Sequence, residues 1–221
     1  MATSKQMVSE IAAVTGTARS AINTITRRLS EADIVARGVR GHAIPNMPAD
    51  SISNMILGAL VLGDGYNNVS ARIVERVNEV RTLQASGDIE LALDDSIAEL
   101  DKSVSVIRDN TFAAIVSNLL VGAVEPETSS RLDQMIVRIG VSFSSGSTEG
   151  WIEWKSGFER AGFVGGPTMD CNTAIVPSMN GFRLVISRGT QGGVTREVSI
   201  DWRAIKRLAE IGAKGNPEWG A

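Results

Sequence analysis

The chain has 221 residues, 43% of them hydrophobic and 21% charged, so it can bury a sizeable core and has the composition of a globular protein. Its single cysteine, Cys171, excludes an internal disulfide bond, and its longest apolar run is far shorter than the roughly 20 residues that span a bilayer. The N-terminus lacks the apolar core of a secretory signal, and we therefore expect a cytoplasmic protein.

The net charge of −3 is unevenly distributed along the chain. Residues 1–45 carry six Lys and Arg side chains and three Asp and Glu side chains, which gives +3, so the remainder carries −6. A basic end on an acidic body is expected when only that end meets phosphate.

Two short helices and a hairpin are predicted at the basic end. The first helix covers residues 4–14, with Ser4 as its cap and Gly16 as its stop. Thr17 can cap the second helix. The inward face of this helix is formed by Ile22, Ile25 and Leu29. Two short extended pieces around the stretch RGVRGH then predict the hairpin, at residues 34–36 and 43–45.

The central part of the sequence is predicted to be mainly helical. One begins at Pro48 and runs to about residue 62, and a second presents the apolar residues of 69–83 on one face. A third covers about 88–109 with a short heptad-like seam, and a fourth, 111–124, is apolar enough to be buried. We expect 48–124 to be a helical region, which either supports dimerisation through these faces or packs into a single core.

The pattern changes after residues 125–131, EPETSSR, which predict a domain boundary. Alternating apolar residues from Met135 to Phe143 predict a strand, and the stretch SSGSTEG, residues 144–150, predicts a turn or loop after it. A hairpin is predicted at Asn180-Gly181, between two β-prone runs.

Residues 132–212 are thus predicted to form a small, mostly antiparallel sheet with a terminal helix capped by Asp201, followed by a loose tail at 213–221. Trp151 and Trp154 could line a pocket in this C-terminal domain for a small-molecule or protein effector. A tryptophan in a small sheet is, however, more often a core residue.

The spacing at the basic end is that of a helix-turn-helix. Ala12 is a small residue where the second helix must approach closely, and Gly16 permits the tight turn. Ile22 and Ile25 hold the two helices together, with Ile11 adding to the core.

Polar side chains occupy the outward side of the second helix. The candidate DNA contacts are Thr17, Arg19, Ser20, Asn23, Thr24, Arg27 and Arg28, the last at the edge of the face. Arginine can pair with guanine and asparagine with adenine through two hydrogen bonds each, and hydroxyl groups bind phosphate or bases. The alternative is that these side chains are simply solvated, because helix-turn-helix geometry also occurs in proteins that never touch DNA.

Together with the hairpin, these residues resemble the winged helix-turn-helix superfamily of DNA-binding proteins, over about residues 4–45, and in particular regulators of phage or prophage type. The resemblance implies sequence-specific binding of double-stranded DNA, usually as a dimer, with residues 1–47 as the DNA-binding domain. In the wing, Arg37, Arg40 and His42 would lie against the backbone or the minor groove. The expected fold class is α+β: a winged helix-turn-helix, a helical centre and a small sheet with a terminal helix.

No catalytic, metal or cofactor site is predicted. His42 is the only histidine and Cys171 the only cysteine, so a zinc site of the usual His and Cys ligands cannot be assembled. No P-loop motif occurs, and the acidic residues of 94–101 are more simply read as a solvated helix face. We therefore expect a protein without enzymatic activity.

Two functional hypotheses follow. The preferred one is a transcriptional regulator, a repressor of phage or mobile-element type that binds double-stranded DNA as a homodimer and does not bind membranes. The alternative is a DNA-recognition subunit for phage packaging, a small terminase-like ring. A third, weaker class is an enzyme with a DNA-binding head. A dimer in solution favours the regulator, and a larger ring favours packaging.

Overall fold

The computed structural model describes residues 3–37, 47–63, 72–84, 111–144, 147–155, 172–178, 181–189, 196–214, 216 and 219. Within these residues it has seven helices and five strands, which confirms a mixed α+β fold. The helices are α1 (Ser4–Thr15), α2 (Arg19–Glu31), α3 (Ala49–Gly63), α4 (Arg72–Arg81), α6 (Phe112–Gly122), α7 (Pro126–Met135) and α8 (Trp202–Ala213). The strands are β1 (Ile136–Phe143), β2 (Ser147–Lys155), β3 (Asn172–Ser178), β4 (Gly181–Gly189) and β5 (Arg196–Asp201). The helix predicted at 88–109 lies outside the described residues.

The first two helices are confirmed, but both predicted caps are wrong by one position. The side chain of Thr3 caps α1 by accepting a hydrogen bond from the backbone N–H of Gln6 at 3.2 Å, and Ser4 is already the first helical residue. The cap position of α2 is occupied by Ala18 rather than Thr17, and no described side chain caps it. Gly16 ends α1 in the left-handed conformation, with φ of 66°, as its predicted role requires.

The apolar faces of α1 and α2 meet each other and α3 in a three-helix arrangement. The apolar residues predicted to face inward are fully buried: Ile11, Ile22, Ile25 and Leu29. Gly58 of α3 lies directly beneath α2, since a Cβ atom there would be 2.9 Å from Cδ1 of Ile25. This close approach fixes α2 against α3.

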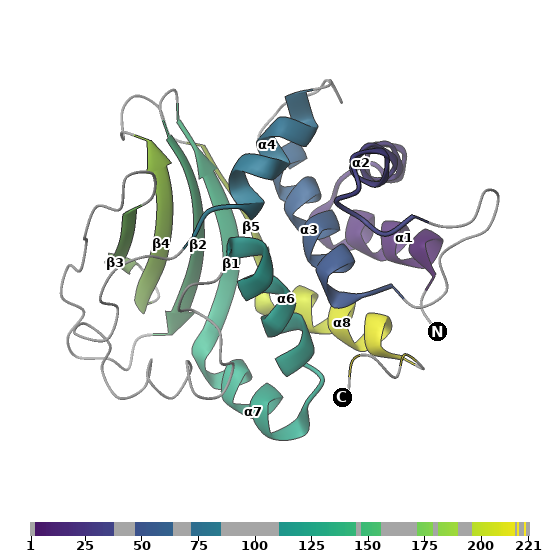
Figure 1. The fold of residues 1–221 in the computed structure, drawn as a ribbon. Helices are drawn as coiled ribbons and strands as arrows, with labels where there is room; N and C mark the ends of the chain where they lie inside the picture. The colour runs from purple at the N-terminus through teal and green to yellow at the C-terminus, as the bar shows by residue number, and fades with distance from the viewer. Residues whose placement is uncertain are drawn as a thin grey trace.

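α3 is the central helix of the molecule. It contacts α1 and α2 and also α4, α6, α8 and the sheet, and in Figure 1 it lies between α2 and the sheet. Every residue from 51 to 61 is buried, including Ser51, Ser53 and Asn54. Ser53 donates a hydrogen bond to the Ala113 carbonyl at 2.8 Å, and Asn54 donates one to the Ile34 carbonyl at 3.0 Å. These bonds satisfy buried polar groups and connect α3 to two other segments.

The segment after α2 differs from its predicted strand. Residues 34–35 form a bend, because the backbone N–H groups of Ile34 and Val35 bond back to the Leu29 carbonyl at the end of α2. The next N–H, of Ala36, donates to the hydroxyl of Ser51 at 3.0 Å. These donors are therefore not available to a β ladder. The rest of the predicted hairpin, residues 38–46, lies outside the described residues.

The five strands form one antiparallel sheet in the order β3-β4-β2-β1-β5. The helices gather on one side of it (Figure 1), and the ring of Phe112 in α6 lies against Gly150 of β2. The strand predicted from alternation is confirmed as β1, but Met135 ends the helix before it. The predicted hairpin is confirmed, since β3 and β4 pair in antiparallel fashion. Gly181, however, which was predicted to lie in the turn, is the first residue of β4 and pairs with Ser178.

Two predictions for the second half of the chain are wrong. The predicted boundary at 125–131 is largely the start of α7, because Pro126 occupies the first turn of this helix, where its missing N–H is tolerated. The glycine-containing stretch before Trp151 was expected to be a turn, but Ser147 to Gly150 begin β2. Proline and glycine thus lie within or at the start of elements here rather than between them.

The last helix is confirmed, and the predicted loose tail is not. Asp201 caps α8 by accepting a hydrogen bond from the N–H of Arg203 at 2.8 Å. In the predicted tail, Asn216 and Trp219 are both buried, and the indole N–H of Trp219 donates to the Met47 carbonyl at 3.1 Å. One continuous core runs from Met7 in α1 to Trp219 and includes residues of every described helix and of β1, β2, β4 and β5.

Candidate nucleic-acid interface

α2 presents a polar face away from the core. Arg19, Ser20, Asn23 and Arg27 are exposed, whereas Thr24 is half-buried and its hydroxyl donates to the Ser20 carbonyl. The side chains of Arg19, Ser20 and Asn23 have no hydrogen-bond or ionic partner within the described part of the chain. The predicted polar face is therefore open to an incoming ligand and is not covered by the described part of the acidic body.

The N-terminus of α2 adds backbone donors to this face. No described side chain caps its first turn, and the first turn contains no acidic residue. Uncapped N–H groups and the helix dipole give such an end a partial positive charge, which favours a phosphate oxygen. Thr17, half-buried just before the helix, and Arg19, exposed in its first turn, lie at this end.

The C-terminal half of the face contains two arginines that share one carboxylate. Glu31 lies 3.7 Å from Nε of Arg27 and 3.6 Å from Nη1 of Arg28. All three side chains are well exposed, at 66%, 45% and 56% of their full areas for Arg27, Arg28 and Glu31. Ion pairs this exposed are weak, so phosphate can compete for both guanidinium groups.

Arg37 is held at the end of α2 rather than on a wing strand. Its Nε and Nη2 donate to the carbonyls of Ser30 and Glu31 at 2.8 and 2.9 Å, and Nε lies 2.8 Å from a carboxylate oxygen of Asp33. A cation on the last carbonyls of a helix satisfies them and interacts favourably with the dipole. Arg37 therefore supports α2, while Arg40 and His42 lie outside the described residues.

An ion pair attaches α1 to α8. Glu10 of α1 accepts a hydrogen bond from Nη2 of Arg207 in α8 at 2.8 Å. This pair neutralises the only acidic residue of α1. The two residues are 197 positions apart in the chain, and no local sequence signal could have indicated their contact.

Other kinds of site were sought in the described residues. No group of three or more His, Cys, Asp or Glu side chains there is arranged to hold a metal ion. None of the described helices has the length and apolar character needed to cross a bilayer. Comparisons with protein-family models, with curated proteins and with solved structures gave no match.

Proposed function

We propose that the protein binds double-stranded DNA through α2, which enters the major groove, and acts as a sequence-specific transcriptional regulator, a repressor of phage or mobile-element type. The observation that carries this proposal is the exposed ridge of Arg19, Asn23 and Arg27 on α2, a helix whose other face is buried against α1 and α3. Its arginines and asparagine have the donors that read guanine and adenine.

The dimensions of the ridge suit a short DNA site. Arg19, Asn23 and Arg27 are four residues apart, so they lie on one face of α2 and span about 12 Å along its axis. Base pairs are stacked about 3.4 Å apart, so this length corresponds to three or four of them. One helix thus reads only part of an operator, and two copies on a two-fold site would double the contact.

Phosphate contacts would come from the two ends of the ridge. The uncapped N-terminus of α2 can accept one phosphate oxygen, and Arg28 lies at the other end beside the weakly held Glu31. Arg40 and His42 remain candidates for wing contacts, as the winged helix-turn-helix resemblance suggests. The acidic remainder of the chain would favour binding with the basic end facing DNA.

The decisive experiment selects duplexes from a randomised pool and then measures their affinity by fluorescence anisotropy. Asn23→Ala and Arg27→Ala should weaken binding of the selected site by roughly tenfold or more and relax the preference at one base pair each. Arg72→Ala removes an exposed arginine on α4 and should leave affinity unchanged. Equal effects of all three substitutions, or no enrichment of any sequence at low salt, would contradict the proposal.

Light scattering of the free protein tests its assembly. A dimer agrees with a regulator that binds a two-fold operator, and half-sites should then lie about one helical turn apart. A larger closed ring would instead support the packaging alternative.

A further inference from the structure

A groove between α8 and α7 has the size of a ligand site. It consists of two hollows of about 550 and 660 Å³, both lined by Asp133, Lys206 and Glu210, and small-molecule sites usually have volumes in this range. The buried side chains of Ile136 and Trp202 also line the larger hollow. The groove therefore combines an apolar part with charged groups.

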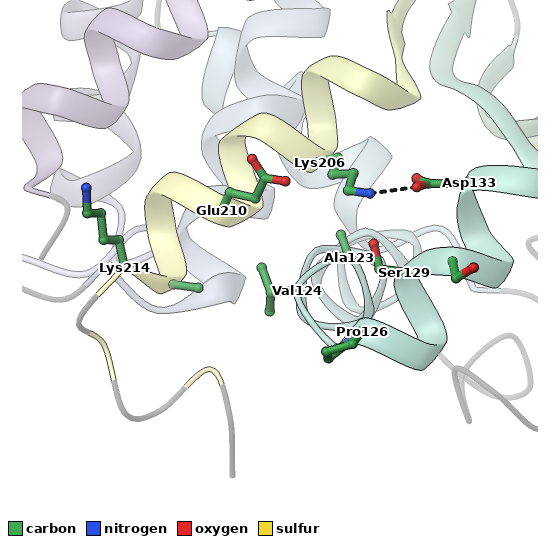
Figure 2. A pocket seen from close by; sticks show the side chains of 10 residues that line it. Ala123, Val124, Pro126, Ser129, Asp133, Lys206, Glu210 and Lys214 are labelled. Carbon is green, nitrogen blue, oxygen red and sulfur yellow. Dashed lines mark hydrogen bonds and ion pairs between the residues drawn. The ribbon is translucent and has the colours of Figure 1, made fainter.

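Asp133 fixes the positions of Trp202 and Lys206 in the groove. The indole N–H of Trp202 donates to Oδ1 of Asp133 at 2.9 Å, and Nζ of Lys206 lies 2.6 Å from Oδ2. Figure 2 shows Lys206 reaching from α8 to Asp133 on α7, across the groove. An ammonium group has three N–H donors, so Lys206 keeps donors for a further acceptor. Asp133 therefore fixes the position of the Lys206 ammonium group but leaves it able to donate a hydrogen bond to a ligand.

The larger hollow is also lined by the charged residues Asp201, Arg203, Arg207 and Glu210. Asp201 caps α8 and Arg207 pairs with Glu10, so Arg203 and Glu210 are the two whose side chains are not already engaged within the described residues. Arg203, Lys206 and Glu210 occur at successive turns of the helix and all line the larger hollow. Arg203 and Glu210 are exposed, and neither side chain has an ion-pair partner in the described ranges. A guanidinium and an ammonium group match a carboxylate, and the free carboxylate of Glu210 matches a second ammonium group.

From this pattern we propose that the groove binds a small amino acid with an anionic side chain. Its carboxylates would be bound by Arg203 and Lys206, and its ammonium group by Glu210. The pattern favours a molecule that carries both signs of charge over a simple dicarboxylate, which would be repelled by Glu210.

The site is also connected to α1 and α2, the helices of the proposed DNA-binding end. Arg207 lines the larger hollow, and the same side chain is paired with Glu10 of α1. The ligand carboxylate bound by Arg203 would lie in the same hollow as Arg207 and would also attract it, which weakens the attachment of α1, a helix that packs against α2. Ligand and DNA then alter each other's affinity by the same factor. This second part rests on the proposed function, whereas ligand binding itself does not.

Calorimetry on the full chain without DNA tests the site by itself. L-aspartate and L-glutamate should bind with Kd values of about 1 mM or below, and succinate should bind at least tenfold more weakly because it lacks the ammonium group. Lys206→Gln and Arg203→Gln should each abolish measurable binding, and Arg72→Gln, which removes an exposed arginine on α4, should not. No heat with either amino acid, equal binding of succinate, or unchanged binding by Arg203→Gln would overturn the proposal. Arg203 has no described ionic partner, so this variant is informative even if Lys206→Gln is unstable.

The connection is tested by measuring DNA affinity with and without the bound amino acid. Saturating ligand should change the Kd for DNA by about fivefold, a typical coupling between two sites. Arg207→Gln should retain ligand binding and lose this change. If the ligand binds but wild-type affinity for DNA is unaffected by it, the connection is refuted. If the ligand binds and no DNA is bound at all, the proposed function fails while the site stands.

Discussion

Substituting Glu31 tests whether the exposed polar face of α2 binds DNA, as we propose. The Glu31 carboxylate pairs with Arg27 and Arg28 at 3.7 and 3.6 Å and would compete with DNA for both arginines. Replacing it with glutamine, Glu31→Gln, keeps the shape of the side chain and removes its charge. We expect the variant to bind DNA more tightly than the wild-type protein.

The size of the gain follows from the exposure of the three side chains. Ion pairs between exposed groups contribute about 0.2–1 kcal/mol each, so losing two of them on binding costs about 1 kcal/mol. The substitution removes this cost, and about 1 kcal/mol corresponds to about fivefold in Kd. Stability should change little, because the loss of these two weak pairs is offset by the removal of a negative charge that is unfavourable at the C-terminus of α2.

Fluorescence anisotropy with a labelled duplex measures the effect over a range of salt concentrations. The gain should be largest at low salt and shrink toward about 0.2 M, where screening weakens both the ion pairs and the phosphate contacts. Glu75→Gln, at an exposed position on α4, changes the net charge equally and is the matched control. If both variants tighten binding by the same factor, or if Glu31→Gln does not tighten it, the assignment of this face to DNA is refuted.

Three substitutions test the packing that supports α2, each by urea denaturation with DNA affinity as a second measurement. Gly16→Ala should cost about 1 kcal/mol through its positive φ alone, since no other atom lies within 4 Å of the new Cβ. Gly58→Ala places a Cβ 2.9 Å from Ile25 and 3.2 Å from Leu29, so it should cost about 1–3 kcal/mol and also weaken DNA binding by shifting α2. Trp219→Ala should cost about 3 kcal/mol or more, and an unchanged stability would show that the C-terminal residues do not pack as described.

The sequence predicted those parts of the fold that depend on local pattern. The inward residues of α2, Ile22, Ile25 and Leu29, are buried as expected because an amphipathic helix must bury its apolar stripe wherever it packs. Gly16 and Asp201 were identified because ending or capping a helix depends only on neighbouring backbone groups. The exposed ridge of α2 follows from the same periodicity.

Other features depend on residues distant in the chain and could not be predicted in this way. The burial of Trp219 requires the Met47 carbonyl 172 positions earlier. Pro126 suggested a boundary because proline ends many elements, but it is equally compatible with the first turn of a helix. The role of Arg37 depends on a turn that folds back over the end of α2.

The central position of α3 has a consequence for how an operator would be read. If α2 is the recognition helix, its close packing on the buried residues 51–61 of α3, with Gly58 directly beneath it, would prevent it from rotating on its own toward a displaced target. In a two-fold dimer whose subunits are held rigidly, the distance between the two copies of α2 would therefore also be fixed. Inserting a few base pairs between half-sites should then be as damaging as changing their sequence, because the duplex would have to deform to compensate.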